Sequence, residues 1–151
     1  FDPARIFVAG HGAGGHLAAT AMAAGTADSG PGAGTVAGGL ALSGIYDLEP
    51  VRLSYQQPTL GLDADDVAAL SPARNLPDSA GPLLLAVGAA ETGEFRRQQA
   101  AFLAAWQAAG LRGQGMELPN RHHFSALDAL TERDDPLFRA LIELVTNGEL
   151  S

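Results

Sequence analysis

The residues that decide the fold are RIFVA at positions 5–9 and GHGAGGHL at positions 10–17. The first segment is rich in β-branched, aromatic and small apolar residues, a composition that favours a short buried strand. The glycine-dense second segment leads into HLAATAMAA, a strong helix former that we expect to end at Gly25. A strand, a glycine turn and a helix in this order are typical of an α/β protein with a parallel sheet.

The rest of the chain continues to alternate strands with helices. Strands are predicted at 36–42, 83–87 and 115–118, and helices at 63–70, 92–109, 124–130 and 135–146. The stretch 43–62 has aromatics and prolines without a sustained period, and we interpret it as a substrate-facing excursion with a short helix near 50–53. A parallel sheet of four strands is thin for a three-layer αβα fold, which predicts that the N-terminal half of the sheet is missing.

The composition excludes several classes of function. The formal net charge of −8 argues against nucleic acid and anionic membranes as partners, because both require a basic face. No apolar run approaches the roughly 18 residues of a membrane helix. With no cysteine there is no disulfide, thiolate metal site or cysteine nucleophile, and a reducing cytoplasm is the default location. We expect no metal and no organic cofactor.

The glycine-rich turn admits a dinucleotide-binding interpretation. Gly10, Gly12 and Gly15 satisfy G-x-G-x-x-G between a strand and a helix, a turn that brings backbone N–H groups against a pyrophosphate. That site also needs an acidic residue about 20 positions further on, at the end of the next strand, to bind the ribose. The only acid near that distance is Asp28, which lies in a Gly- and Ser-rich loop.

A second interpretation is the nucleophile elbow G-x-S-x-G, with Gly12 in place of the serine. The elbow turns so tightly that side chains at Gly10 and Gly14 are expected to collide with neighbouring backbone. The central residue adopts strained dihedral angles, and Gly12 relieves that strain while removing the hydroxyl. A plain strand-to-helix turn without chemistry remains a third interpretation of this segment.

Two residues further along the chain favour the elbow. In hydrolases with this elbow the nucleophile, the acid and the base follow one another in the sequence, with the acid and the base after later strands. Glu91 comes directly after the predicted strand 83–87, and His123 lies in the loop after 115–118. Glu94 is the alternative acid and His122 the alternative base.

These residues resemble the kynurenine formamidase-like (arylformamidase-like) α/β-hydrolases, which are related to esterases and lipases. The resemblance extends over nearly the whole chain in order. It rests on GHxAGGHL at 10–17, SGIYDLEP at 43–50, LSP at 70–72, Gly88-x-x-Glu91-x-x-Glu94-Phe95-x-Arg97-Gln98, and His123-Phe124-Ser125.

The resemblance implies a role for each matching position. Gly12 occupies the position of the serine nucleophile, Glu91 that of the triad acid and His123 that of the general base. The backbone N–H of Ala13 corresponds to one donor of the oxyanion hole. His11 and Tyr46, with the segment 49–60, are expected to line the substrate pocket. The family's other oxyanion donors precede the elbow, so residues 1–151 are expected to be the C-terminal portion of one α/β-hydrolase domain, from the elbow through the final helix.

The function expected from the resemblance is hydrolysis of a carboxylic ester or an N-formyl amide. Because Gly12 cannot attack a carbonyl, the chain is expected to be catalytically impaired as written. A pseudoenzyme that binds an acyl ligand or a protein partner remains an alternative, as does the dinucleotide-binding domain. The expected partner is a small-molecule substrate, and a homodimer is left open.

Overall fold

The chain forms a four-stranded parallel sheet in which the strands follow one another in the order of the sequence. The computed structural model describes residues 2, 5–24 and 36–150. The strands are β1 (Ile6–His11), β2 (Val36–Leu42), β3 (Leu83–Gly88) and β4 (Gly113–Leu118). Each parallel connection requires a crossover, and helices α1 (Ala13–Ala23) and α5 (Gly93–Ala108) provide two of them. The predicted α/β fold with a parallel sheet is confirmed.

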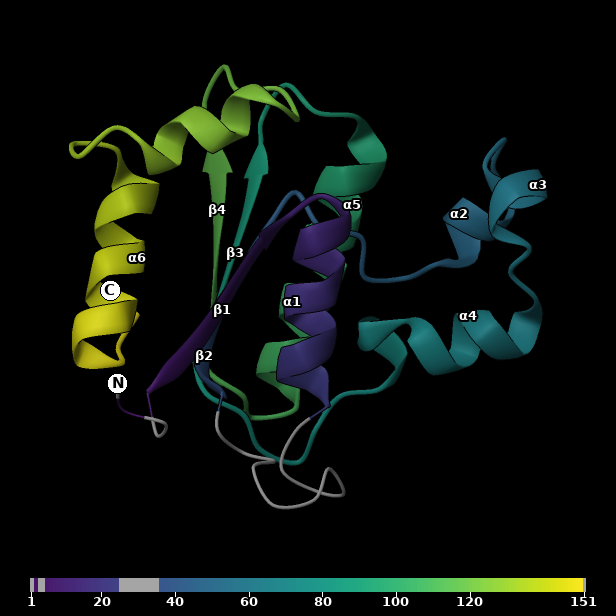
Figure 1. Cartoon of the computed structure of the whole chain (residues 1–151), viewed down its shortest axis with the longest axis horizontal. Helices are drawn as coiled ribbons and strands as arrows, with labels where there is room; N and C mark the ends of the chain where they lie inside the picture. Colours follow the sequence, from purple (N-terminus) through teal and green to yellow (C-terminus); the bar gives the residue numbers. More distant parts are fainter. Residues whose placement is uncertain (1, 3–4, 25–35, 151) are drawn as a thin grey trace.

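Helices cover both faces of the sheet, which gives three layers (Figure 1). Helices α1 and α5 lie on one face, while α6 (Pro136–Asn147) lies on the other. The two cores follow the alternation of the strands. On the α6 side Leu84 and Ala86 pack with Leu137 and Leu144, and on the other side Leu83 and Leu85 pack with Met22, Phe102 and Trp106.

The strand β3 has a continuous apolar sequence without alternating polar residues. All its residues are buried, because layers of side chains cover both of its faces. Strands in this position have continuous apolar sequences, as LLLAV does. By contrast, the edge strand β4 has only one fully buried residue, Leu118.

The excursion between β2 and β3 extends away from the layers (Figure 1). It contains α2 (Glu49–Arg52), α3 (Gln57–Leu60), α4 (Ala64–Leu70) and the 3₁₀ turn η1 (Pro72–Arg74). Asp63, the first residue of the predicted helix 63–70, caps α4. Its carboxylate accepts a hydrogen bond from the Asp66 N–H, and the Asp66 carboxylate accepts one from the Asp63 N–H. The stretch 43–62 has two short helices, α2 and α3, where one was predicted near 50–53, and the turn η1 after α4 was not predicted.

Other details differ from the expectations. Residues 125–130 form the 3₁₀ segment η2 (Ser125–Leu130) instead of an α-helix, and β4 begins two residues before the predicted start. Helix α1 ends before Ala24, and Gly25, the expected cap, lies outside the described residues. In the described part of the chain, no helix is long and apolar enough to cross a membrane.

Candidate active site

The carboxyl edge of the sheet brings Gly12, Glu91 and His123 together. Gly12 follows β1, Glu91 follows β3, and His123 lies in the loop after β4. The Glu91 Oε2 and His123 Nδ1 atoms are 2.8 Å apart. A Cβ atom built on Gly12 would lie 3.3 Å from His123 Nε2. The structure therefore places a carboxylate next to an imidazole, and that imidazole next to position 12.

The backbone at Gly12 has the dihedral angles φ 58° and ψ −119°, a region that L-residues rarely occupy. Its N–H donates to the Leu42 carbonyl at 3.0 Å, so the turn is fixed to the end of β2. The helix α1 begins at the next residue, Ala13. The N–H of Ala13 belongs to the first turn, where backbone N–H groups have no partner within the helix and the helix dipole favours negative charge.

The Glu91 carboxylate is buried, with a side chain that is 1% exposed. Its Oε1 accepts hydrogen bonds from the Ser43 hydroxyl at 2.5 Å and from the Gly88 N–H at 2.9 Å. Its Oε2 contacts His123 Nδ1. Because a carboxylate only accepts, Nδ1 carries the proton and Nε2 of the neutral ring becomes the acceptor that faces Gly12.

Three rings surround His123. The ring centroids of His11, Phe95 and Phe124 lie 4.5, 5.0 and 5.3 Å from that of the imidazole. His11 also donates through Nε2 to the His123 carbonyl oxygen at 2.8 Å. These contacts fix the imidazole against the glycine turn.

The sequence predicted that side chains at Gly10 and Gly14 would collide with neighbouring backbone, and the structure agrees at Gly10 only. A Cβ on Gly10 would lie 1.9 Å from the Gly14 carbonyl oxygen, so Gly10 must lack a side chain, as expected. A Cβ on Gly14 would meet nothing within 4 Å, so the expected collision at Gly14 is wrong. The second crowded position is Gly15, where a Cβ would lie 2.8 Å from the Leu42 carbonyl oxygen, because α1 packs directly on the end of β2.

We expect Gly10→Ala to destabilise the fold by about 3 kcal/mol or more, because the backbone carbonyl of Gly14 cannot move without displacing the start of α1. Gly14→Ala is the matched control, and we expect it to be neutral or stabilising by up to about 1 kcal/mol. Urea unfolding of both variants measures the difference. Equal stabilities for the two variants would contradict the packing of this turn.

The two residues expected to line the substrate pocket lie elsewhere. Tyr46 is only 1% exposed and stacks on Phe102 in the core with ring centroids 4.5 Å apart. Burial raises the pKa of its phenol far above the usual range. Its assignment to the pocket was wrong, because the start of the excursion runs through the core before it reaches the surface. His11 contacts His123 and binds its backbone, so it supports the imidazole.

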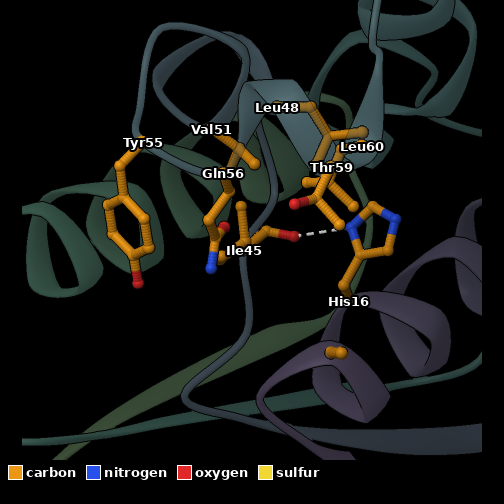
Figure 2. Close-up of a pocket in the computed structure, with 9 residues that line it drawn as sticks. His16, Ile45, Leu48, Val51, Tyr55, Gln56, Thr59 and Leu60 are labelled. Atoms are coloured by element: carbon orange, nitrogen blue, oxygen red, sulfur yellow. Dashed lines mark hydrogen bonds between the residues drawn. The ribbon is translucent and has the colours of Figure 1, made fainter.

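A cavity of about 500 Å³ lies beside the glycine turn, between α1 and the excursion (Figure 2). In Figure 2 the Nδ1 of His16 is hydrogen-bonded to the Ile45 carbonyl oxygen, at 2.8 Å. Because a carbonyl only accepts, His16 Nδ1 is the donor. Most of the lining is apolar, and most of it comes from the excursion. The lining residues are Ala13, His16, Ile45, Leu48, Val51, Tyr55, Gln56, Thr59 and Leu60.

Sequence reasoning missed Gln98, which fixes the excursion to α5. Its side chain is buried although it is polar. Its Oε1 accepts from the N–H groups of Tyr46 and Asp47 at 2.7 and 2.8 Å, and its Nε2 donates to the Asp47 carbonyl at 3.0 Å. It also missed Ser43, whose polar contact with Glu91 exists only after β2 and β3 have paired. Both residues stand in the motifs quoted for the family resemblance, but the sequence assigned no role to either side chain.

We expect Gln98→Leu to lower the free energy of unfolding by about 3 kcal/mol, because each buried backbone group left without a partner costs about 1–3 kcal/mol. Gln107→Leu, on the same helix, is the control, since Gln107 is exposed and its side chain donates to the Gly113 carbonyl. Its expected change is within about 0.5 kcal/mol. Denaturant unfolding compares the two, and an unchanged stability for Gln98→Leu would contradict this role.

The alternative site residues have other partners. Glu94 pairs with Arg97 at 2.7 Å, and the Arg97 hydrogen bond lowers the pKa of that carboxyl. The Nδ1 of His122 accepts from the Ser125 N–H at 3.3 Å, within its own loop. Asp28 lies outside the described residues. Among the described residues, no group of three or more His, Cys, Asp or Glu side chains could hold a metal ion.

The parallel sheet and the helices on its two faces have the α/β-hydrolase fold. Solved structures with the same fold include a truncated carbohydrate esterase from gut microbiota, with a TM-score of 0.72 and 17% identity over 98% of this chain and 61% of that one. A thermophilic esterase of Thermogutta terrifontis matches with a TM-score of 0.69 and 22% identity over 99% of this chain and 57% of that one.

In sequence the chain is similar to the kynurenine formamidase of Danio rerio, with 27% identity over 147 residues. The match covers 93% of this chain and 49% of the relative, so the chain spans about half the length of that protein. The resemblance to kynurenine formamidase-like hydrolases is thereby confirmed. No model of a protein family matches the chain.

Proposed function

We propose that this chain carries the acid and base half of an acyl-hydrolase site for carboxylic esters or N-formyl amides, with glycine at the nucleophile position. The observation that carries the proposal is the Glu91–His123 pair at 2.8 Å, with Nε2 facing position 12. An acceptor nitrogen next to that position is the arrangement that activates a serine hydroxyl. The similarity to a kynurenine formamidase supports the same class of reaction.

The mechanism follows from the geometry with a serine at position 12. His123 Nε2 takes the hydroxyl proton as the oxygen attacks the carbonyl carbon, and the Glu91 carboxylate stabilises the imidazolium through Nδ1–H. The N–H of Ala13 and the N-terminus of α1 stabilise the oxyanion. The proton then passes from Nε2 to the leaving group, which leaves an acyl-enzyme on the serine. Water next attacks the acyl carbon and gives a proton to Nε2, and Nε2 returns that proton to the serine oxygen as the acid leaves.

The cavity beside Ala13 is the proposed binding site for the apolar group of the substrate. The cavity adjoins Ala13, whose N–H would hold the oxyanion. Its apolar lining includes Leu48, Val51 and Leu60 of the excursion. An apolar lining of this kind favours aliphatic or aryl groups over charged ones. The segment 49–60, which was expected to line a substrate pocket, supplies most of this lining.

The test is a gain of function. Gly12→Ser in the full chain should hydrolyse p-nitrophenyl acetate or an N-formyl aryl amide and should react covalently with a fluorophosphonate. A folded Gly12→Ser protein that stays at the buffer rate with both substrates and remains unlabelled would overturn the proposal.

A pseudoenzyme that binds an acyl ligand without turnover is the second candidate. The cavity beside Ala13 favours this candidate, because the cavity could bind an acyl group even though position 12 has no hydroxyl to attack it. The dinucleotide interpretation has less support. Ser43 follows β2 at the point where that site needs its acidic residue, and its hydroxyl binds Glu91.

A further inference from the structure

The side of the imidazole that faces position 12 is open to small molecules. Apart from the flanking residues His11 and Ala13, the atoms of the described chain within 4 Å of a Cβ on Gly12 would be Nε2 and Cε1 of His123, at 3.3 and 3.6 Å. The glycine itself carries no side chain, and the His123 side chain is 30% exposed. The space next to Nε2 therefore accommodates a water molecule at the place where a serine hydroxyl would stand.

The protonation of the ring suits it for acting on such a water. The Glu91 carboxylate accepts from Nδ1, so Nε2 carries the lone pair. The buried position of Glu91 and its bonds from Ser43 and Gly88 hold this tautomer. A histidine with a fixed tautomer and a water at Nε2 is a general base, and general-base assistance contributes about 10²–10⁴-fold to a reaction.

We propose that the chain with its own Gly12 hydrolyses activated aryl esters slowly by direct attack of water, without an acyl-enzyme. The inference rests on the proposed function, because it uses the same acid–base pair. One water oxygen bonds to the carbonyl carbon while its proton passes to His123 Nε2. The intermediate then breaks its bond to the aryl oxygen, which leaves and takes up the proton from Nε2. One ester and one water give one carboxylic acid and one phenol.

The experiment measures the hydrolysis of p-nitrophenyl acetate by the unaltered full chain. His123→Ala should lower the rate above buffer by about 10²-fold, the lower end of a general-base contribution. Gly12→Ala places a methyl group 3.3 Å from His123 Nε2, which crowds the position of the water. It should lower the rate by about 10-fold or more, a loss of at least about 1.4 kcal/mol of transition-state stabilisation. Progress curves should be linear from the first turnover, and mass spectrometry of the quenched protein should show no acyl adduct.

The control is His122→Ala, which removes an exposed neighbouring imidazole and should change the rate by less than about twofold, as expected for a group outside the site. The inference is overturned if His122→Ala loses as much activity as His123→Ala, if an acyl-protein is found, or if the unaltered chain is no faster than folded His123→Ala. Should Gly12→Ser turn over the ester while the unaltered chain does not, this inference fails and the proposed function stands. If neither protein is active, both fail.

Discussion

Gly12→Ser is expected to raise the hydrolysis of an aryl ester by at least about 10²-fold over the unaltered chain. The physical reason is that the Cβ of residue 12 points at His123 Nε2 from 3.3 Å, so a hydroxyl one bond further lies within reach of the base. Removing the nucleophile from a working triad costs on the order of 10⁶ in kcat, so 10² is a low estimate that allows for incomplete oxyanion stabilisation. A burst of phenol before the steady rate should reveal the acyl-enzyme.

The same substitution should cost stability. With φ at 58° and ψ at −119°, any L-residue at position 12 is strained, and we expect a loss of about 1–3 kcal/mol. Gly12→Ala is the matched variant, because it has the same strain without the hydroxyl. Both variants should unfold at similar denaturant concentrations, while only the serine variant shows the burst. A burst from Gly12→Ala would show that the acyl group goes to another residue.

Glu91→Gln in the Gly12→Ser background is expected to lower kcat by about 10³–10⁴-fold with little change in KM, as the loss of the carboxylate in other triads does. The amide oxygen should replace Oε1 as acceptor for the Ser43 hydroxyl and the Gly88 N–H. Its NH₂ group then faces His123 Nδ1 and donates to it. The ring is forced into the tautomer with the proton on Nε2, which cannot accept the serine proton.

Glu94→Gln is the control for this result. Glu94 comes three residues after Glu91 and was the alternative acid, but it is 43% exposed and paired with Arg97. We expect kcat to change by less than about threefold, since an exposed ion pair contributes little. Steady-state kinetics of the two variants compares them directly. A larger loss from Glu94→Gln than from Glu91→Gln would move the acid to the other carboxylate.

Much of this molecule follows from local sequence alone. The apolar runs predicted β2 and β3, and Asp63 predicted the start of α4, because burial on both faces and helix capping are properties of neighbouring residues. Gly12, Glu91 and His123 come after the first, third and fourth strands, and this order predicted that they share one edge of the sheet, since the carboxyl ends of parallel strands meet there. This prediction therefore required no knowledge of how the loops between the strands fold.

Tertiary structure alone decided which polar groups meet across the strands. The Ser43 hydroxyl reaches Glu91 and the Gln98 side chain reaches the backbone of Tyr46 and Asp47, and these contacts join residues about fifty positions apart. The inward turn of Tyr46 and the free space at Gly14 also depend on how α1 and α5 pack on the sheet. A sequence pattern records which faces are apolar, but the partners of a buried polar group are fixed only when separate elements come together.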